Sequence, residues 1–280
     1  MNLMWLCFCL VATAYVRFVV GKEIVPSDLL ISTVIDPSSA TVSRDALTLL
    51  RSIRLFGGRL NEATVLVSIA LNKGESLEDH SGLLNDLSDL GVEVDVIFQP
   101  EAPKPKTLNK FSTLDKFDAT RFAYFLWLDA DIVVFQDPLP YLQAHKRPGM
   151  IECAPEFYSY LRRYPELNST SVVWNSAMSQ LRTLGEGDNV PMGVCNTGVL
   201  FFDVMSLQRF VAALPEAARK VDELNASVRD RFIDSLYFVS TVNAAEIDVH
   251  PLSYSMNYMA FFEKYIVEDT DTTQVVMAHF

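Results

Sequence analysis

Two aspartates, Asp129 and Asp131, stand one residue apart at the end of an apolar run in YFLWLDADIVVFQDP (124–138). In an extended chain, side chains two positions apart point to the same side, so both carboxylates could reach one cation across the small Ala130. Two hard oxygen ligands with positions left for water and phosphate suit Mg²⁺ or Mn²⁺. The alternative is a pair of loop carboxylates held in hydrogen bonds, because this spacing alone is weak support for a metal site.

The segments before this pair alternate between apolar runs of strand length and stretches of helical period. We expect strands at 28–35, 63–70, 92–98 and 124–135, and helices at 44–58 and 76–91. The strand runs are apolar throughout, which is typical of an α/β fold with a mostly parallel central sheet and helices on both faces. Ligands of such sheets bind beyond the carboxyl ends of the strands, where the two aspartates would emerge.

Composition limits what this edge of the sheet can bind. The 280 residues are 50% hydrophobic and 21% charged, enough for the core of one large domain or two small ones. The formal net charge is −12, which disfavours nucleic acid as a partner. An anionic ligand would therefore need a metal ion or a few well-placed cations.

The N-terminal segment is strongly apolar and ends near ATA at 12–14, a pattern typical of a signal peptide over 1–21. A signal anchor is the close alternative, because Leu3 to Val20 is nearly long enough to cross a bilayer; a buried first strand is the third. The sequons at Asn168 and Asn225 agree with a secretory route. We expect the secretory pathway (Golgi or ER lumen), with possible membrane anchoring through this segment; the alternative is the cytoplasm.

Two cysteines, Cys153 and Cys195, remain outside this segment. They could pair in an oxidising lumen or be ordinary buried thiols. Neither has a second cysteine or histidine at ligand spacing, which disfavours a metal role.

Four further segments carry a resemblance to a known family. NKFSTLDKFDATRFAYFLWLDADIVVFQDPLPYL (109–142) is similar to the centre of a GT-A (nucleotide-diphospho-sugar transferase) fold glycosyltransferase, most closely glycosyltransferase family 8, the glycogenin and galactosyltransferase-like group. CNTGVLFFDV (195–204) resembles its Asn-Ser/Thr-Gly-Val strand, and FIDSLYF followed by HPLSYSMNY its Asp-Gln helix and Leu-Pro-x-x-x-Asn segment. The terminal VVMAHF resembles the strand that delivers a histidine to the metal. The resemblance spans 28–280.

The resemblance implies a catalytic domain over 22–280 with a metal site for Mn²⁺ or Mg²⁺ and a nucleotide-sugar donor, expected to be UDP-linked. It implies metal ligation by Asp129, Asp131 and His279. The implied donor-binding residues are Asp36 near the base, Lys110 at the diphosphate or sugar, Asp129, Asp131, Thr197 and Gly198. The implied catalytic residues are Asp234 and Asn196.

Several of these residues have a plainer interpretation. Asp36 could simply cap the turn into PSS, and Lys110 could be a solvated surface lysine. Asn196 and Gly198 could serve only a turn in which glycine supplies an unusual backbone angle.

The last implied ligand, His279, is the penultimate residue, where chain ends fray unless they are tied down. Asp234 could be a carboxylate on a helix surface. The sequence departs from the family in two respects. Family members usually continue past this histidine with a Gly and a Lys that contact the diphosphate, and Ser235 stands where the family often has Gln.

The resulting hypothesis is a hexosyltransferase-type enzyme that moves a sugar from a nucleotide diphosphate to a hydroxyl of a glycan, protein or lipid, with retention of configuration. The alternative is an inactive relative that binds a sugar nucleotide or glycan. The stretch 156–190 could be an acceptor-binding insertion or a helical excursion over the sheet. A P-loop enzyme and a serine hydrolase are disfavoured because the sequence lacks their motifs, and a nucleotidyltransferase because no Gly-rich loop follows the first strand.

Overall fold

The computed structural model describes most of the chain between residues 23 and 280. The described residues are 23–98, 106–154, 176, 179–180, 195–224, 226–229, 233–259 and 274–280. The targeting segment expected at 1–21, both sequon asparagines and nearly all of the stretch 156–190, predicted as either an acceptor-binding insertion or a helical excursion, lie outside them. Within the described part of the chain, no helix is both long and apolar enough to cross a membrane.

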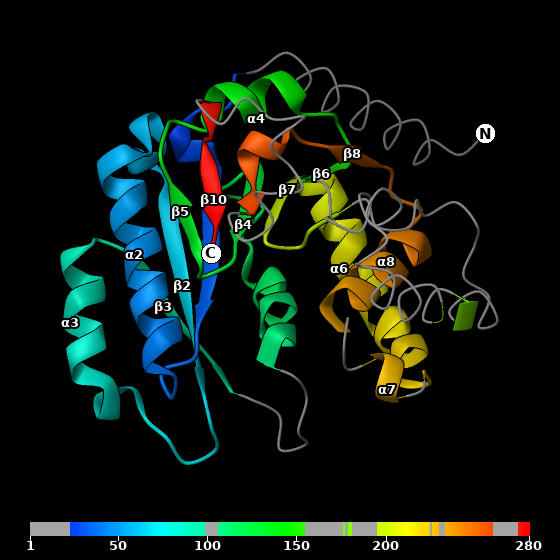
Figure 1. Ribbon diagram of the computed structural model, residues 1–280, viewed down its shortest axis with the longest axis horizontal. Coiled ribbons are helices and arrows are strands. Elements are labelled where there is room, and N and C mark those ends of the chain that lie inside the picture. Colours follow the sequence, from blue (N-terminus) through cyan, green and yellow to red (C-terminus); the bar gives the residue numbers. More distant parts are fainter. Residues whose placement is uncertain are drawn as a thin grey trace, which may run out of the picture.

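A seven-stranded sheet forms the centre of the molecule in the order β3-β2-β1-β4-β7-β6-β8 (Figure 1). Its strands are β1 Leu29–Ile35, β2 Thr64–Leu71, β3 Glu93–Phe98, β4 Tyr124–Leu128, β6 Ile151–Cys153, β7 Val199–Asp203 and β8 Val249–Pro251. Strands β3, β2, β1 and β4 run parallel, and β7 is antiparallel to both of its neighbours. The predicted α/β fold with a mostly parallel sheet is confirmed.

Helices cover both faces of this sheet, with α2 and α3 on one side and α6 and α8 on the other (Figure 1). The α-helices are α2 Ala40–Phe56, α3 Ser81–Asp89, α4 Leu139–His145, α6 Val204–Asp222, α7 Ala226–Arg229 and α8 Ile233–Ala244. Segments of 3₁₀ helix span Pro26–Asp28, Gly58–Glu62, Leu77–His80, Lys106–Lys116 and Tyr254–Met256.

Strand β4 explains why its sequence is an unbroken apolar run. Phe125 and Trp127 pack into the apolar layer under α6 and α8, whereas Tyr124, Leu126 and Leu128 pack into the layer under α2. Every residue of the strand is buried. A strand enclosed on both faces shows no polar alternation.

The predicted single strand over 124–135 is wrong. Strand β4 ends at Leu128, and Asp129 to Asp131 form a turn in which the Ile132 N–H donates to the Asp129 carbonyl at 3.1 Å. The chain then enters β5 (Ile132–Val134) of a second sheet, of order β5-β10-β9, with β9 Tyr258–Met259 and β10 Met277–His279. The aspartates therefore converge through a turn and not through the alternation of an extended strand.

Two predicted helices have different limits in the structure. Helix α2 begins four residues earlier than predicted, after Ser39, whose hydroxyl accepts from the Val42 N–H at 3.3 Å as an N-cap. The helix predicted at 76–91 divides into the 3₁₀ turn Leu77–His80 and α3, and the chain leaves it through Gly91 at φ 61°.

Candidate active site

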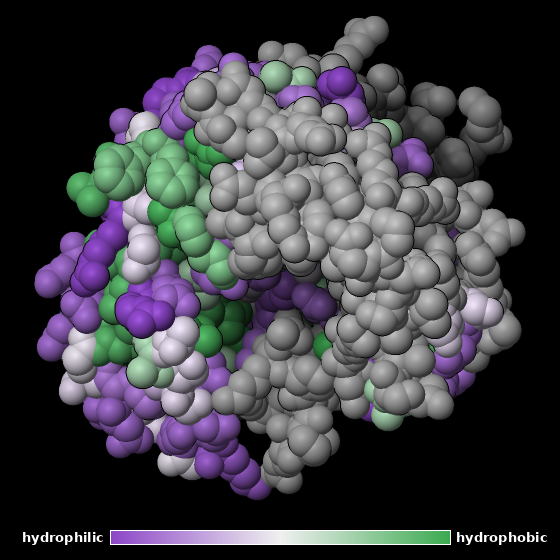
Figure 2. All heavy atoms as spheres, viewed as in Figure 1, coloured by the Kyte–Doolittle hydropathy of each residue, from purple (hydrophilic) through white to green (hydrophobic). Residues whose placement is uncertain are grey.

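The predicted site residues gather at the carboxyl ends of β1 and β4. A cavity of about 270 Å³ lies there, and its lining includes Asp36, Lys110, Asp129, Asp131 and Asp234. Figure 2 shows hydrophilic residues inside a hollow near the middle of the viewed face. The cavity thus lies at the edge of the sheet where the sequence predicted the two aspartates.

Asp129, Asp131 and His279 form a compact group of potential metal ligands. One ligand atom from each lies within 4.8 Å of the others. The His279 Nε2 is 3.2 Å from Asp131 Oδ1, because antiparallel pairing of β10 with β5 sets His279 opposite Ile132. Pairing with β5 and β9 also ties down the strand that carries this histidine.

The electrostatics of the group favour a cation. Burial lowers the pKa of His279, but its hydrogen bond to Asp131 and the charges of Asp131 and Asp129 outweigh burial and raise it. Burial in turn raises the pKa of Asp131, and His279 outweighs it, so that this pKa falls below its usual value. The two carboxylates thus stabilise positive charge where the imidazole proton lies.

This donor set fits a divalent metal ion. A cation at this place could replace the imidazole proton and take one oxygen from each aspartate. Two carboxylates with one imidazole suit Mn²⁺ better than Mg²⁺, which prefers oxygen ligands and retains water. The fit rests on residue chemistry and on the separation of the three side chains.

Lys110 lies beside the metal-ligand group and is almost fully buried, with 6% of its surface exposed. Its Nζ is 3.1 Å from Asp129 Oδ1 and 3.3 Å from Asp234 Oδ2, and it donates to Thr197 Oγ1 at 3.1 Å. Burial lowers the pKa of Lys110, but the two carboxylates outweigh burial and raise it. The solvated-surface interpretation of Lys110 is therefore wrong.

Asp234 opens α8 and completes this network. Its Oδ2 accepts from Thr197 Oγ1 at 2.9 Å, and its Oδ1 accepts from the Ser235 N–H at 2.9 Å. Burial raises the pKa of the Asp234 carboxyl. The charge of Lys110 and the hydrogen bond from Thr197 outweigh burial, so the pKa lies below its usual value and Asp234 is held ionised. It points into the cavity and is not a helix-surface carboxylate.

The turn 195–198 carries Asn196, Thr197 and Gly198. Gly198 is not among the glycines with positive φ, so the interpretation that it supplies an unusual backbone angle is wrong. A Cβ there would lie 2.9 Å from the His279 ring and 2.8 Å from Asn196 Oδ1. Glycine is needed at this position for close approach.

Asp36 caps the turn after β1, as its plainer interpretation predicted, and it also lines the cavity. Its Oδ1 accepts from the N–H and the hydroxyl of Ser38 at 3.0 and 2.6 Å, which stabilises the turn after β1. It is also 6% exposed at the edge of the cavity. Its predicted contact with a nucleotide base stays a prediction.

Three lining residues with polar side-chain groups were missed by the sequence analysis: Asp45, Asn109 and Trp127. Trp127 matters most, because its Nε1–H donates to Asp129 Oδ1 at 2.7 Å and orients that carboxylate. A tryptophan inside an apolar run is typical of a core residue, although this one stands only two residues before Asp129 and its Nε1–H reaches that carboxylate. Asn109 could have been suspected from its place beside Lys110.

Cys153 and Cys195 form a disulfide, with Cα atoms 5.5 Å apart. Of the two alternatives that sequence left open, the structure shows pairing. The bond joins the end of β6 to the residue before Asn196.

The fold has counterparts among solved structures. The galactosyltransferase LgtC, in complex with donor and acceptor sugar analogs, matches with a TM-score of 0.59 at 14% identity, over 90% of this chain and 86% of its own. The bifunctional glycosyltransferase WbbM matches at 0.56 and 14% identity, over 92% of this chain and 46% of its own. The glycosyltransferase GlyE of Streptococcus pneumoniae TIGR4 matches at 0.53 and 12% identity, over 89% of this chain and 53% of its own.

These neighbours define the class of fold: the chain has the GT-A glycosyltransferase fold, as its sequence resemblance implied. No protein-family model matches the chain, and no curated protein matches it in sequence. At 12–14% identity the likeness establishes the fold, and activity has to be argued from the site.

Proposed function

We propose that this protein is a metal-dependent glycosyltransferase that moves a sugar from a UDP-linked donor to an acceptor hydroxyl, with retention of configuration. The observation that carries the proposal is the grouping of Asp129, Asp131 and His279 next to the buried Lys110, at a cavity that the two aspartates and Lys110 line. The glycosyltransferase names of the structural neighbours support sugar transfer as the reaction class.

The residues present suit this chemistry. A divalent ion held by Asp129, Asp131 and His279 would offset the charge that develops on a departing diphosphate. Lys110, kept cationic by its two carboxylates, adds a fixed positive charge beside the same place. Asp234, held ionised by Lys110 and Thr197, presents a carboxylate to the cavity. In the reaction, the acceptor oxygen bonds to the anomeric carbon, and the diphosphate leaves with the electrons of the broken bond and accepts the hydroxyl proton.

We further propose that residues 22–280 form a single catalytic domain. A signal peptide or signal anchor at 1–21 would direct this domain into the secretory pathway. The Cys153–Cys195 disulfide supports this route, because stable disulfides are typical of oxidising compartments. The proposed acceptor is a hydroxyl of a glycan, protein or lipid in this pathway, and the proposed donor sugar is a hexose.

Isothermal titration of the purified protein with UDP, with and without Mn²⁺, tests the donor site. We expect binding that requires Mn²⁺ and is lost in Asp129→Asn/Asp131→Asn. The matched control Asp86→Asn/Asp89→Asn removes the same charge from α3, away from the cavity, and should bind UDP like the wild type. Equal binding without Mn²⁺ would show that the metal site is wrongly assigned.

One residue favours a second candidate, a binding protein without transferase activity. Ser235 stands where the family often has Gln, and among the described residues it does not line the cavity. Metal-dependent UDP binding together with no release of UDP from UDP-sugars in the presence of acceptors would favour this candidate.

A further inference from the structure

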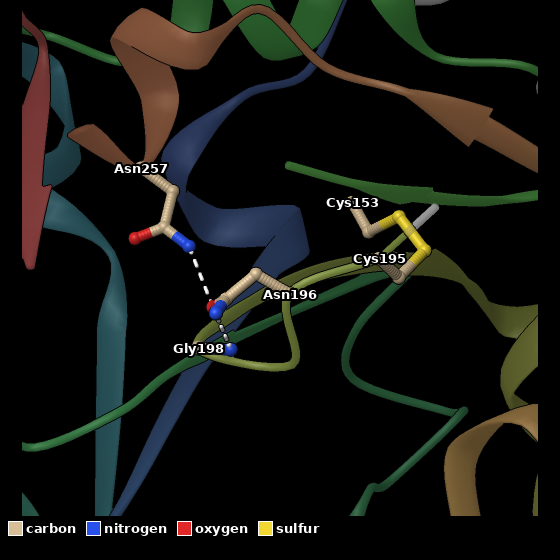
Figure 3. The surroundings of a disulfide bond; sticks show 5 residues. All are labelled: Cys153, Cys195, Asn196, Gly198 and Asn257. Carbon is tan, nitrogen blue, oxygen red and sulfur yellow. Dashed lines mark hydrogen bonds between the residues drawn. A yellow bond between two sulfur atoms is a disulfide. The ribbon is translucent and has the colours of Figure 1, made fainter. Parts of the chain in front are cut away.

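The turn 195–198 is held by a hydrogen-bonded centre, shown in Figure 3. Asn196 Oδ1 accepts from the Gly198 N–H at 2.8 Å and from Asn257 Nδ2 at 2.7 Å. The Asn196 N–H donates to the Ala154 carbonyl at 2.8 Å. The side-chain oxygen of Asn196 is thus occupied by two donors of the protein itself.

The disulfide fixes the start of the turn. Cys195 directly precedes Asn196, and its partner Cys153 is the last residue of β6 (Figure 3). The Cys153 carbonyl accepts from the Leu252 N–H at 2.7 Å, so the anchor itself is held within the structure. Cys153 is fully buried, with 0% exposed.

The end of the turn touches two of the metal ligands. The Gly198 carbonyl accepts from the Asp129 N–H at 2.8 Å. The His279 ring packs against Gly198 so closely that a Cβ would lie 2.9 and 3.0 Å from its Cε1 and Nδ1. A shift of the turn by a few tenths of an ångström would therefore displace the imidazole or its neighbour.

Asn257 holds the side chain of Asn196 from a segment outside the turn. It is 0% exposed, and within the described residues its Oδ1 has no hydrogen-bond partner. Burying an amide oxygen without a partner costs free energy. The Nδ2 group of Asn257, which donates to Asn196, is therefore the reason to have an amide at this buried position. Met259, two residues on, pairs with His279 between β9 and β10. One segment thus holds both the turn and the strand of the histidine.

We propose that the Cys153–Cys195 disulfide and Asn257 are positioning elements that hold the turn 195–198 against His279 and Asp129. Without either element the turn moves, and the geometry of the metal site is lost. The inference rests on the proposed function in one respect, namely that His279 and the two aspartates bind a metal ion.

Two measurements on purified protein test the proposal. Binding of Mn²⁺ alone is followed by electron paramagnetic resonance, and hydrogen exchange is followed for the peptide that contains Gly198. The variants are Asn257→Ala and Cys153→Ala/Cys195→Ala. The control is Ser255→Ala, which removes a buried hydroxyl that bonds Ser253 in the same segment but does not reach the turn.

We expect Mn²⁺ affinity to fall about tenfold or more in both test variants, the effect typical of removing partners that orient metal ligands. Exchange at the Gly198 peptide should accelerate in the same variants and stay at wild-type rates in the control. Wild-type Mn²⁺ affinity in Asn257→Ala would overturn the proposal, whatever the exchange rates and whether or not the cysteine variant folds. Absence of Mn²⁺ binding in the wild type would instead refute the metal site of the proposed function.

Discussion

At the scale of single residues, the site is built from charges that hold one another in place. Lys110 contacts Asp129 and Asp234, and Asp131 contacts His279, so the buried lysine and the partly buried groups around it each have an opposite partner. Breaking one partner of a buried pair leaves an uncompensated charge, which is far more costly than the loss of an exposed pair. A carboxyl on β6 shows the opposite balance, because burial outweighs the charge of the nearby Arg147.

That carboxyl is Glu152. Burial, with a further contribution from Asp203, raises its pKa to about 8. The folded protein keeps this proton up to about pH 8, whereas the unfolded chain loses it near pH 4.5. The stabilisation is therefore complete below pH 4.5 and is lost as pH rises to 8. Glu152→Gln should remove this dependence and be more stable than the wild type at pH 9 by roughly 3–5 kcal/mol.

Urea unfolding at pH 5, 7 and 9 measures the effect of Glu152→Gln. Glu62→Gln, at an exposed glutamate, is the control and should follow the wild-type pH profile. Parallel profiles for Glu152→Gln and wild type would contradict the assignment of a neutral buried acid.

Gly198→Ala tests the close approach of Gly198 to His279 at the proposed metal site. The added methyl would meet the His279 ring at 2.9 Å and Asn196 Oδ1 at 2.8 Å, so the turn or the ring must move. We expect a loss of about 1–3 kcal/mol in unfolding free energy and weaker Mn²⁺ binding. Gly82→Ala is the control, because a Cβ there meets nothing within 4 Å, and it should be neutral or slightly stabilising. Unchanged Mn²⁺ binding in Gly198→Ala would show that the ring tolerates the methyl.

At the scale of elements, helix starts determine how the second half of the sheet packs. Asp203 ends β7 and caps α6, its Oδ1 accepting from the Ser206 N–H at 2.7 Å. Its Oδ2 accepts from the Gly149 N–H at 2.7 Å. One buried carboxylate thus connects a strand end, a helix start and the loop before β6.

Asp203→Ala should therefore lower the unfolding free energy by about 2–3 kcal/mol, since it removes a cap and a second charge-assisted hydrogen bond. Ser39→Ala removes only the single cap of α2, with its longer 3.3 Å bond, and should cost about 1 kcal/mol or less. Urea denaturation of both variants measures the difference. Equal losses would mean that the bond to Gly149 contributes nothing.

The elements also show what sequence could and could not predict. Strands β1, β2 and β3 were predicted within one residue, because their apolar runs end at turn residues such as Asp36, whereas β4 was predicted correctly only at its start. The division between β4 and β5 was missed because IVVF continues the apolar run, and only pairing with β10, far along the chain, shows that it belongs to another sheet. The spacing of Asp129 and Asp131 predicted that the two carboxylates lie together, whereas His279 was predicted from family resemblance alone.

At the scale of the whole molecule, distant parts of the chain meet at one edge of the central sheet. Asp129 and Asp131 follow β4, the turn at 195–198 leads into β7, and His279 arrives on the last strand. The net charge of −12 opposes any anionic ligand, so the buried Lys110 and a metal ion would have to supply local attraction for a diphosphate. The assembly of the site depends on contacts between segments far apart in sequence.

The disulfide is the one covalent link between such segments in the described chain. It joins residues separated by 42 positions, for which the chain-entropy treatment gives a stabilisation of about 4 kcal/mol. Reduction by dithiothreitol, which itself becomes a cyclic disulfide, should therefore lower the urea midpoint of the wild type substantially. Cys153→Ala/Cys195→Ala should show the lower midpoint with or without dithiothreitol. Thiol titration must first show that reduction is complete. If the urea midpoint of the wild type is then unchanged, noncovalent contacts alone hold β6 and the turn 195–198 together. The disulfide would in that case no longer support a secretory route.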